Sequence, residues 1–218
     1  MGAGFDPARR RKVTISEREG DCPDLKAGKT LQRMTPPEIV SEILAVYRQR
    51  GHRHYGENVT EEQHALQCAT LAHEAGEPPE IVASCLLHDY GHLLHDLGED
   101  VADHGVDARH EHVGANRLAA YFGENVVEPI RLHADSKRYL CWKEDTYLDG
   151  LSEASRKSLT LQGGPMTEEE AQAFERHPQF DRAIRVRRYD DRGKIAGMKT
   201  PDLDAFRPVL ESVVVRPS

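Results

Sequence analysis

Hydrophobic residues recur every three or four positions along most of this chain from residue 35 onward, which is the spacing of one buried helix face. The first such segment has Thr35 as its N-cap and Pro36 at its first helical position. It ends at Gly51, and its apolar positions are Ile39, Ile43, Leu44 and Tyr47. The pattern predicts an amphipathic helix that packs against a core.

Residue types that begin helices predict further elements. Thr60 and Gln63 form a capping box for a helix that runs to Gly76, and Pro79 begins an apolar helix that ends near Leu94. The remaining predicted helices span about 108–122, 125–141, 152–161, 168–176, 179–191 and 202–214. Alternating strand patterns are scarce, so the predicted fold is all-α, a compact helical bundle with irregular loops.

The chain divides by composition into a short first segment and one domain. Residues 1–34 are polar and lack a sustained period, so we expect a tail or covering segment there. Residues 35–218 have the length of one domain.

Charge and cysteine usage exclude several classes of protein. The net charge of −8 disfavours a nucleic-acid partner, and the one basic cluster, at residues 9–12, is expected to be a solvated tip. No apolar run is long enough to span a membrane, and no apolar segment follows the charged N-terminus as a secretory signal requires. The four cysteines are widely spaced and form no CxxC pair, which favours the reducing cytoplasm.

The dipeptide His88-Asp89 lies inside a predicted apolar helix and suggests a metal site. A buried aspartate is costly unless it is paired or bound to a cation. A carboxylate has two oxygens and can bridge two cations, whereas an imidazole ligates one. An adjacent His-Asp pair can therefore serve two metal ions at once.

Four or five predicted helices each offer a ligand toward a shared centre, as in dinuclear sites of helical bundles. Asp190 is followed by Asp191, and either could instead pair with Arg187 or Arg188. His73, His104, His112 and His177 are interpreted as residues outside the site. The predicted metal ligands are His64, His88, Asp89, His110, His133 and Asp190.

This order of ligands resembles that of the HD-domain superfamily in its dinuclear form. Longer strings resemble the HD-domain oxygenases of phosphonate degradation more closely: GENVT, LLHDYGHLL at 86–94, RLHADSKRYLC at 131–141, SLTLQGGPM at 158–166 and RRYDD at 187–191. The resemblance covers about residues 36–214.

The resemblance implies a mixed-valent di-iron centre (Fe2+/Fe3+) that uses O2 to cleave the carbon–phosphorus bond of a 1-hydroxyphosphonate, releasing phosphate. The expected substrate is of the 2-amino- or 2-trimethylammonio-1-hydroxyethylphosphonate type, chelated to one iron. Nitrogen and oxygen donors without thiolates suit iron or manganese, and the ligand types do not separate the two metals.

A phosphonate dianion also needs cationic or hydroxyl donors. Lys137 lies four residues after His133, and Arg187 lies three before Asp190, so each shares a helix face with a ligand. His92 lies four residues after His88, so the spacing predicts that these two also share a helix face. The resemblance places Lys137 and Arg187 at the phosphonate, together with His92 and a hydroxyl of Ser155 or Ser158. A salt bridge to nearby acids is the alternative interpretation of Lys137 and Arg187.

The loop before His64 carries a further expectation from the family. There a glutamate meets the substrate amine, and Glu57 matches it. A tyrosine normally lies three residues before that glutamate and gates the vacant iron position. This chain has His54 at that spacing and Tyr55 one residue later, so Tyr55, His54 or neither acts as the gate.

Two other functions use the same residues. A metal-dependent phosphohydrolase would employ the six ligands to attack a phosphomonoester or nucleotide with metal-bound hydroxide. A catalytically silent sensor could keep the fold and bind a phosphonate or nucleotide without turnover.

Overall fold

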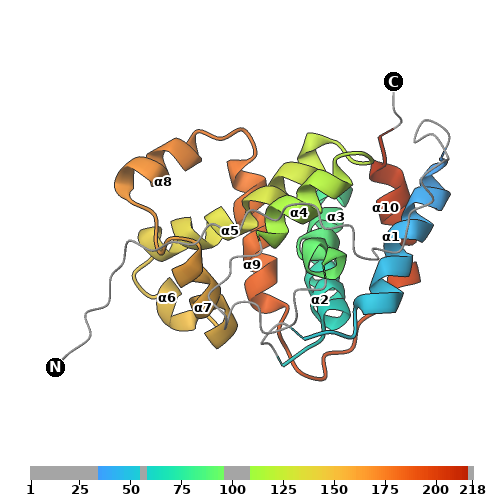
Figure 1. Ribbon diagram of the computed structural model, residues 1–218, viewed down its shortest axis with the longest axis horizontal. Coiled ribbons are helices and arrows are strands. Elements are labelled where there is room, and N and C mark those ends of the chain that lie inside the picture. Colours follow the sequence, from blue (N-terminus) through green and yellow to red (C-terminus); the bar gives the residue numbers. More distant parts are fainter. Residues whose placement is uncertain (1–33, 55–57, 96–108, 216–218) are drawn as a thin grey trace.

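The computed structural model describes residues 34–54, 58–95 and 109–215 of the chain (Figure 1). These residues form mainly helices, and their extended backbone pairs only in an isolated bridge between Phe122 and Val214. The predicted all-α class is confirmed. The elements are α1 (Pro36–Arg50), α2 (Glu61–Glu74), α3 (Pro79–Leu87), η2 (Tyr90–Leu94), α4 (His110–Leu118), α5 (Glu124–Lys143), α6 (Tyr147–Gly150), α7 (Glu153–Leu161), α8 (Glu168–Glu175), α9 (Phe180–Arg192), η3 (Leu203–Phe206) and α10 (Arg207–Val213).

Capping residues fix the beginnings of several helices where the sequence predicts them. Thr35 and Thr60 are the N-caps of α1 and α2, and both helices begin with a capping box. Thr167 accepts from the backbone N–H of Glu170 at the start of α8 in the same way. These bonds satisfy backbone donors that have no partner within the helix.

The predicted helix from Pro79 to Leu94 is wrong in its second half. The α-helix ends at Leu87, His88 is its C-cap, and Asp89 has φ −99° and ψ 11°. A tighter 3-10 turn, η2, follows. It brings Gly91 against α4 so closely that a Cβ atom there would lie 1.9 Å from the carbonyl oxygen of His110. This tight approach, which periodicity does not reveal, accompanies the change of helix type.

The other differences are smaller. The helix predicted over 202–214 divides into η3 and α10, where Pro208 stands in the first turn of the second helix. The short helix α6 was not predicted. The start predicted at 108 for α4 falls at the edge of the described residues, and α4 ends at Leu118 rather than at 122.

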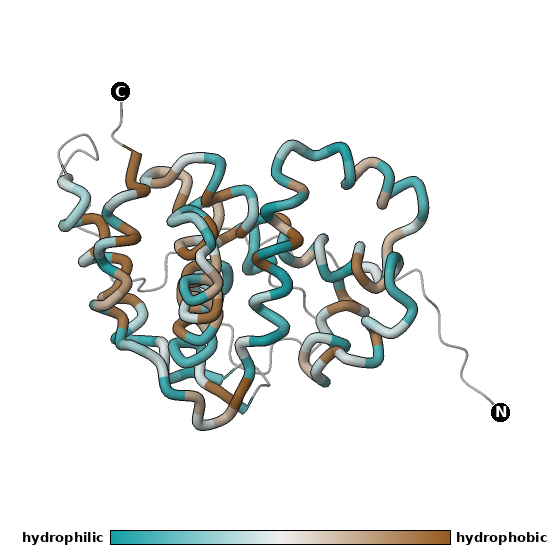
Figure 2. Tube along the Cα trace, turned by 180° about the vertical axis from the view of Figure 1, so that it is seen from behind, coloured by the Kyte–Doolittle hydropathy of each residue, from teal (hydrophilic) through white to brown (hydrophobic). Residues whose placement is uncertain are grey.

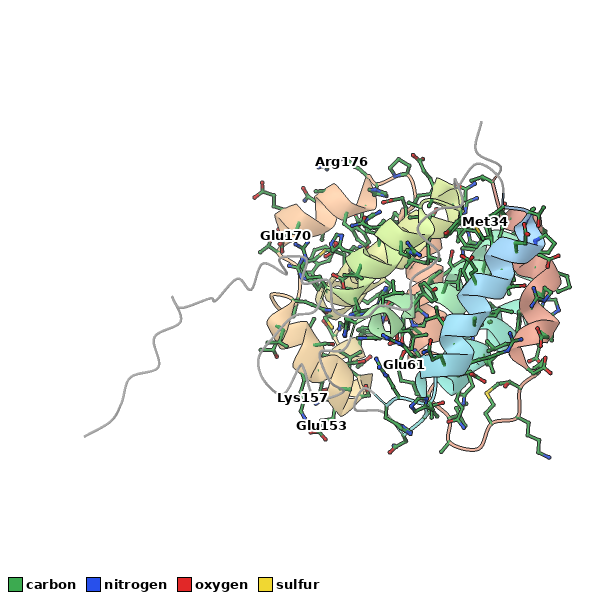
Figure 3. All side chains as sticks on the ribbon, turned by 45° about the vertical axis from the view of Figure 1, so that its right-hand side comes forward. Met34, Glu61, Glu153, Lys157, Glu170 and Arg176 are labelled. Atoms are coloured by element: carbon green, nitrogen blue, oxygen red, sulfur yellow. The ribbon has the colours of Figure 1, made fainter. Side chains whose placement is uncertain are left out.

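Two hydrophobic clusters build the core. The larger one joins α1, α2, α3, η2, α4, η3 and α10 with the first part of α5, and the smaller one joins the later part of α5 with α8. The hydropathy-coloured trace shows this division: apolar positions gather in α1, α3 and α10, whereas α8 is mostly hydrophilic (Figure 2). The outer side of α7 carries exposed charge, such as the Glu153–Lys157 ion pair (Figure 3).

Helices α5 and α9 connect the two clusters and pack against each other. Along α5, Ile130 belongs to the larger cluster and Leu132 to the smaller one. His133 follows at this boundary. On α9, Ala183 belongs to the smaller cluster and Val186 to the larger one. The candidate site therefore lies where the two halves of the core meet.

Candidate metal centre

The carboxylate of Asp89 lies between two pairs of histidines. Its Oδ2 atom is 3.2 Å from His88 Nε2 and 3.5 Å from His64 Nε2. Its Oδ1 atom is 3.2 Å from His110 Nε2 and 3.5 Å from His133 Nε2. One carboxylate thus faces two sets of nitrogen donors, one with each oxygen.

Asp190 completes the first set. Its Oδ1 atom is 3.3 Å from His64 Nε2 and 3.9 Å from His88 Nε2. The neighbouring Asp191 instead pairs with Arg187 and accepts from the Tyr147 hydroxyl. The structure therefore brings all six predicted ligands together and distinguishes Asp190 from Asp191.

Four of the six candidate ligands come from separate helices, and the adjacent pair His88-Asp89 lies between α3 and η2. His64 lies in the first turn of α2, and His110 is the first residue of α4. His133 lies in the middle of α5, and Asp190 lies near the end of α9. Because α9 packs on α2, α3 and α5, its aspartate reaches the histidines of the other helices.

Backbone carbonyls orient three of the four imidazoles. The Nδ1 atoms of His64, His88 and His133 lie 2.8, 2.9 and 2.7 Å from carbonyl oxygens. A carbonyl only accepts, so each Nδ1 donates, and the Nε2 atom of each ring points to the centre, where a metal ion would take the place of any proton on it. The accepting carbonyls belong to Gly193, Cys85 and Ile130.

Gly193 is required by close packing at the first set. A Cβ atom there would lie 2.3 Å from Cys68 Sγ and 3.3 Å from His64 Nδ1. Gly91 and Gly114 play the same part at the second set, where a Cβ atom on Gly114 would lie 2.9 Å from the Gly91 nitrogen. Sequence analysis did not identify these glycines, because their role depends on contacts between distant segments.

The pKa values in this cluster are strongly perturbed. Burial alone would lower the pKa of His88, but the adjacent Asp89 outweighs it and raises the pKa to about 9. Burial lowers the pKa of His133 to about 3, despite the nearby Asp89. Burial would raise the pKa of Asp89, yet His88 and His110 hold it well below its usual range. The carboxylate is ionised, and His133 is neutral at pH 7.

The donor set fits a pair of cations. The Nε2 atoms of His64 and His88 are 3.1 Å apart, and those of His110 and His133 are also 3.1 Å apart. With each Nδ1 donating to a carbonyl, the Nε2 atoms of His64 and His88 face each other at the first set, where the raised pKa of His88 corresponds to a proton held among buried acceptors. At the second set, the neutral His133 faces a carboxylate oxygen. Such buried acceptors require a shared proton or a cation between them. Imidazole and carboxylate donors from facing helices are the ligands of dinuclear metal sites.

Two nearby side chains were outside the predicted ligand set. Cys68 Sγ lies 3.7 Å from His64 Nδ1, but it donates to the carbonyl of Tyr189, and burial raises the pKa of its thiol well above the usual value. It therefore remains a protonated thiol. The second side chain is His92, which lies near Asp89 and His110.

His92 does not share a helix face with His88 as the spacing predicted. It belongs to η2 and stacks on the ring of His110, with the ring centroids 3.9 Å apart and the planes at 17°. Burial and the neighbouring His110 hold its pKa well below the usual value. His92 is therefore a neutral ring beside the second set of donors. The 3-10 turn η2 places it there, and not the helix face that the sequence predicted.

Lys137 and Ser155 lie on one side of the centre. Lys137 is buried, donates to Ser158 Oγ at 2.6 Å, and has a pKa lowered to about 7 by burial and by the Arg187 charge. Ser155 is also buried, and its Oγ accepts from Lys194 Nζ at 3.1 Å. Lys194 Nζ also lies 3.5 Å from Asp190 Oδ1, a contact that sequence analysis missed.

Arg187 is buried in an ion-pair network. Its Nη1 atom donates to Asp190 Oδ2 at 2.6 Å, Nη2 contacts Asp191, and Nε donates to the Tyr147 hydroxyl at 2.9 Å. The salt-bridge alternative is therefore present in the structure. Tyr55 and Glu57 lie outside the described residues, and His54 is exposed at the edge of that gap.

Comparison with known proteins gives a family and three relatives. The HD-domain family matches residues 62–175. Hydroxymethylphosphonate dioxygenase of Gimesia maris is 43% identical over 179 residues, covering 82% of this chain and 89% of that protein. The glycine-betaine-forming [1-hydroxy-2-(trimethylamino)ethyl]phosphonate dioxygenase of Leisingera caerulea is 40% identical over 185 residues, covering 84% and 94%. An uncharacterized protein of Acanthamoeba polyphaga mimivirus is 34% identical over 174 residues, covering 78% and 80%.

Among the described residues, no helix has the length and apolar character needed to cross a membrane.

Proposed function

This chain belongs to the phosphonate oxygenases of the HD-domain family, and from that premise we propose that it is a di-iron oxygenase that cleaves the carbon–phosphorus bond of a 1-hydroxyphosphonate and releases phosphate. The observation that carries the proposal is the position of Asp89, whose two oxygens face two separate sets of donors. A carboxylate that faces two sets of donors can bridge the two cations of a dinuclear centre. The compartment we propose is the reducing cytoplasm, in keeping with the free thiols of Cys68 and Cys85.

The proposed ligands divide into two groups. His64, His88 and Asp190 would hold one iron, His110 and His133 would hold the other, and Asp89 would serve both. When bound, a mixed-valent Fe2+/Fe3+ pair supplies activation of O2 and accepts electrons from the substrate. Manganese accepts the same donors, so the metal is a point for experiment.

The substrate residues provide donors for a phosphonate dianion. The ammonium of Lys137 and the hydroxyls of Ser155 and Ser158 lie together beside the centre, where burial strengthens their interaction with an anion. His92, which stacks on His110, is a further polar group proposed to contact the phosphonate. These groups bind and orient the substrate and exclude water from it.

Arg187 is not wholly available to bind the phosphonate, because part of its guanidinium pairs with neighbouring side chains. Three of its N–H directions are used by Asp190, Asp191 and Tyr147. It stabilises the charge of Asp190 and retains further N–H groups for a phosphonate oxygen. Glu57 is proposed to meet the substrate amine, and Tyr55 is proposed as the gate with His54 as the alternative.

The two relatives define the substrate panel. One is named for hydroxymethylphosphonate, which has no amine, and the other for a phosphonate with a trimethylamino group. The panel should therefore contain hydroxymethylphosphonate and the 2-amino- and 2-trimethylammonio-1-hydroxyethylphosphonates.

The test is oxygen uptake measured together with phosphate release. Protein loaded anaerobically with ferrous iron and then partly oxidised is given each phosphonate. Oxygen uptake matched by phosphate supports the oxygenase. With both irons present, absence of uptake across the panel would refute it. Hydrolysis of phosphomonoesters or nucleotides with manganese and without oxygen uptake would then indicate the phosphohydrolase, and tight binding without turnover would indicate a sensor.

A further inference from the structure

The four candidate histidine ligands differ in what faces the nitrogen on the far side of each ring. The Nδ1 atoms of His64, His88 and His133 face neutral backbone carbonyls. His110 is the exception, because its Nδ1 atom lies 3.5 Å from Oε2 of Glu111, a carboxylate. The second set of donors therefore has an anion behind one of its rings, and the first set does not.

The carboxylate of Glu111 is buried, and one of its oxygens has no hydrogen-bond donor among the described residues. The residue is 6% exposed, and its Oε2 atom is buried and accepts no hydrogen bond from the described residues. Its other oxygen lies 3.8 Å from His112 Nε2, beyond hydrogen-bond distance. A buried ionised oxygen without a donor costs free energy, so its retention here calls for a compensating partner.

A proton on His110 Nδ1 would supply that partner. When Nε2 ligates a metal, the proton of a neutral imidazole can reside only on Nδ1, which then faces Glu111. The 3.5 Å separation is a charge contact that becomes a hydrogen bond after a small rotation of the ring. Metal binding on one side of the ring and the carboxylate on the other thus favour the same tautomer.

The position of Glu111 in the first turn of α4 offers a competing explanation, since acidic residues there interact favourably with the helix dipole. An exposed carboxylate would serve that purpose without the cost of burial. The close approach of Gly91 and Gly114 fixes this turn against η2, which holds Glu111 beside the His110 ring. The dipole alone does not account for this placement.

At the first set, by contrast, cations lie beside the additional carboxylate. Asp190 is contacted by two cations, Arg187 at 2.6 Å and Lys194 at 3.5 Å. They withdraw negative charge from that carboxylate, whereas Glu111 adds negative charge behind His110. The two halves of the centre are therefore electrostatically unequal, although each has two histidines.

We propose that Glu111 is a positioning residue for His110: its carboxylate accepts the Nδ1–H, holds Nε2 toward the metal, and makes this side of the centre more electron-rich. The proposal rests on the dinuclear centre of the proposed function. No proton leaves the ring, which keeps its Nδ1–H throughout. An anion behind a ligand strengthens its donation and favours the more highly charged metal ion.

The test compares Glu111→Gln with wild type in anaerobic titration with ferrous iron, followed by measurement of the reduction potential of the iron pair. Glu111→Gln keeps the shape of the side chain and removes its charge. We expect the first iron to bind as in wild type, the second to bind about 10-fold more weakly or worse, and the potential to become more positive. Glu77→Gln is the matched control, because Glu77 is a largely buried carboxylate that pairs instead with Arg185.

A second variant guards against a folding defect. Glu111→Asp keeps the charge on a shorter side chain, so the carboxylate lies farther from the His110 ring. We expect its affinity for the second iron to lie between that of wild type and that of Glu111→Gln. Identical iron affinities and potentials in wild type and both variants would overturn the role of Glu111 while leaving the centre intact. A wild-type protein that binds no second iron would overturn the dinuclear centre itself, and the role of Glu111 with it.

Discussion

Replacing Arg187 with methionine should destabilise the metal-free protein much more than the iron-loaded protein. Arg187 is 3% exposed and donates 2.6 Å from Asp190 Oδ2. Without it, the buried Asp190 keeps more distant nitrogen neighbours, with Lys194 Nζ at 3.5 Å, His64 Nε2 at 3.3 Å and His88 Nε2 at 3.9 Å from Oδ1. Breaking a buried ion pair in this manner costs about 3–5 kcal/mol.

That loss corresponds to a melting temperature roughly 6–20 °C lower for a chain of this size. Iron bound to Asp190 would replace part of the lost positive charge, so the loss should shrink when both irons are present. Thermal unfolding of wild type and Arg187→Met, each with and without ferrous iron under anaerobic conditions, measures the difference.

The adjacent arginine provides the control. Arg188 is partly exposed and pairs with Glu144, and surface pairs contribute only about 0–1 kcal/mol. Arg188→Met should therefore have a small effect that iron does not change. If Arg187→Met loses equal stability with and without iron, then Asp190 does not exchange the arginine for a metal, and the ligand assignment of Asp190 is refuted.

Three further predictions follow from the same cluster. Asp89→Ala should bind neither iron firmly, because both sets of donors lose the bridge, and a purified variant that retains two irons would contradict the assignment. Gly193→Ala should weaken iron binding, because the added methyl lies 2.3 Å from Cys68 Sγ and forces apart the segment that accepts from His64; unchanged iron content would refute this. Lys137→Met should reduce substrate affinity and retain both irons. The metal-free form of Lys137→Met should also be more stable than metal-free wild type at pH 6, because burial disfavours the charged ammonium of Lys137. This difference in unfolding free energy should shrink as the pH rises from about 7 toward the ordinary lysine pKa of 10.5. In that range the unfolded wild-type chain binds more protons than the folded one, so the stability of wild type rises with pH. Urea unfolding across that range checks the sign, and a difference that is independent of pH would refute it.

Local signals in the sequence were sufficient for most of the helices. The capping boxes at Thr60 and Thr167 involve residues only three positions apart, so their outcome depends little on the rest of the chain. The spacing of buried residues in α1 is similarly local, and Ile39, Ile43 and Leu44 are all buried. Such elements can be predicted before any tertiary contact is known.

The end of α3 could not be predicted in this way. The apolar pattern continues through Leu93 and Leu94, and nothing nearby signals a change from α-helix to 3-10 helix at Asp89. The deciding contact is with His110 on another helix, where Gly91 approaches the backbone. The error in the helix also caused the wrong prediction that His88 and His92 share a face.

The candidate ligands were predicted as a set, whereas the residues that support them were not. His64 and Asp190 belong to a recognisable order of residue types along the chain. The carbonyl of Gly193 and the ammonium of Lys194 acquire their roles only through packing of the segment after α9. Glu111 stands next to His110 in the sequence, but an acidic residue at that position is ordinary unless it is buried. The sequence does not show that burial.

The bond between His64 and Gly193 joins residues 129 positions apart. A metal ion shared by His64 and Asp190 would close nearly the same stretch of chain into a loop. By analogy with a disulfide, for which closing a 100-residue loop removes about 4.7 kcal/mol of chain entropy from the unfolded state, such a metal acts as a reversible crosslink. Loss of the metal would then loosen the attachment of α9 to α2 and shorten the lifetime of the folded chain.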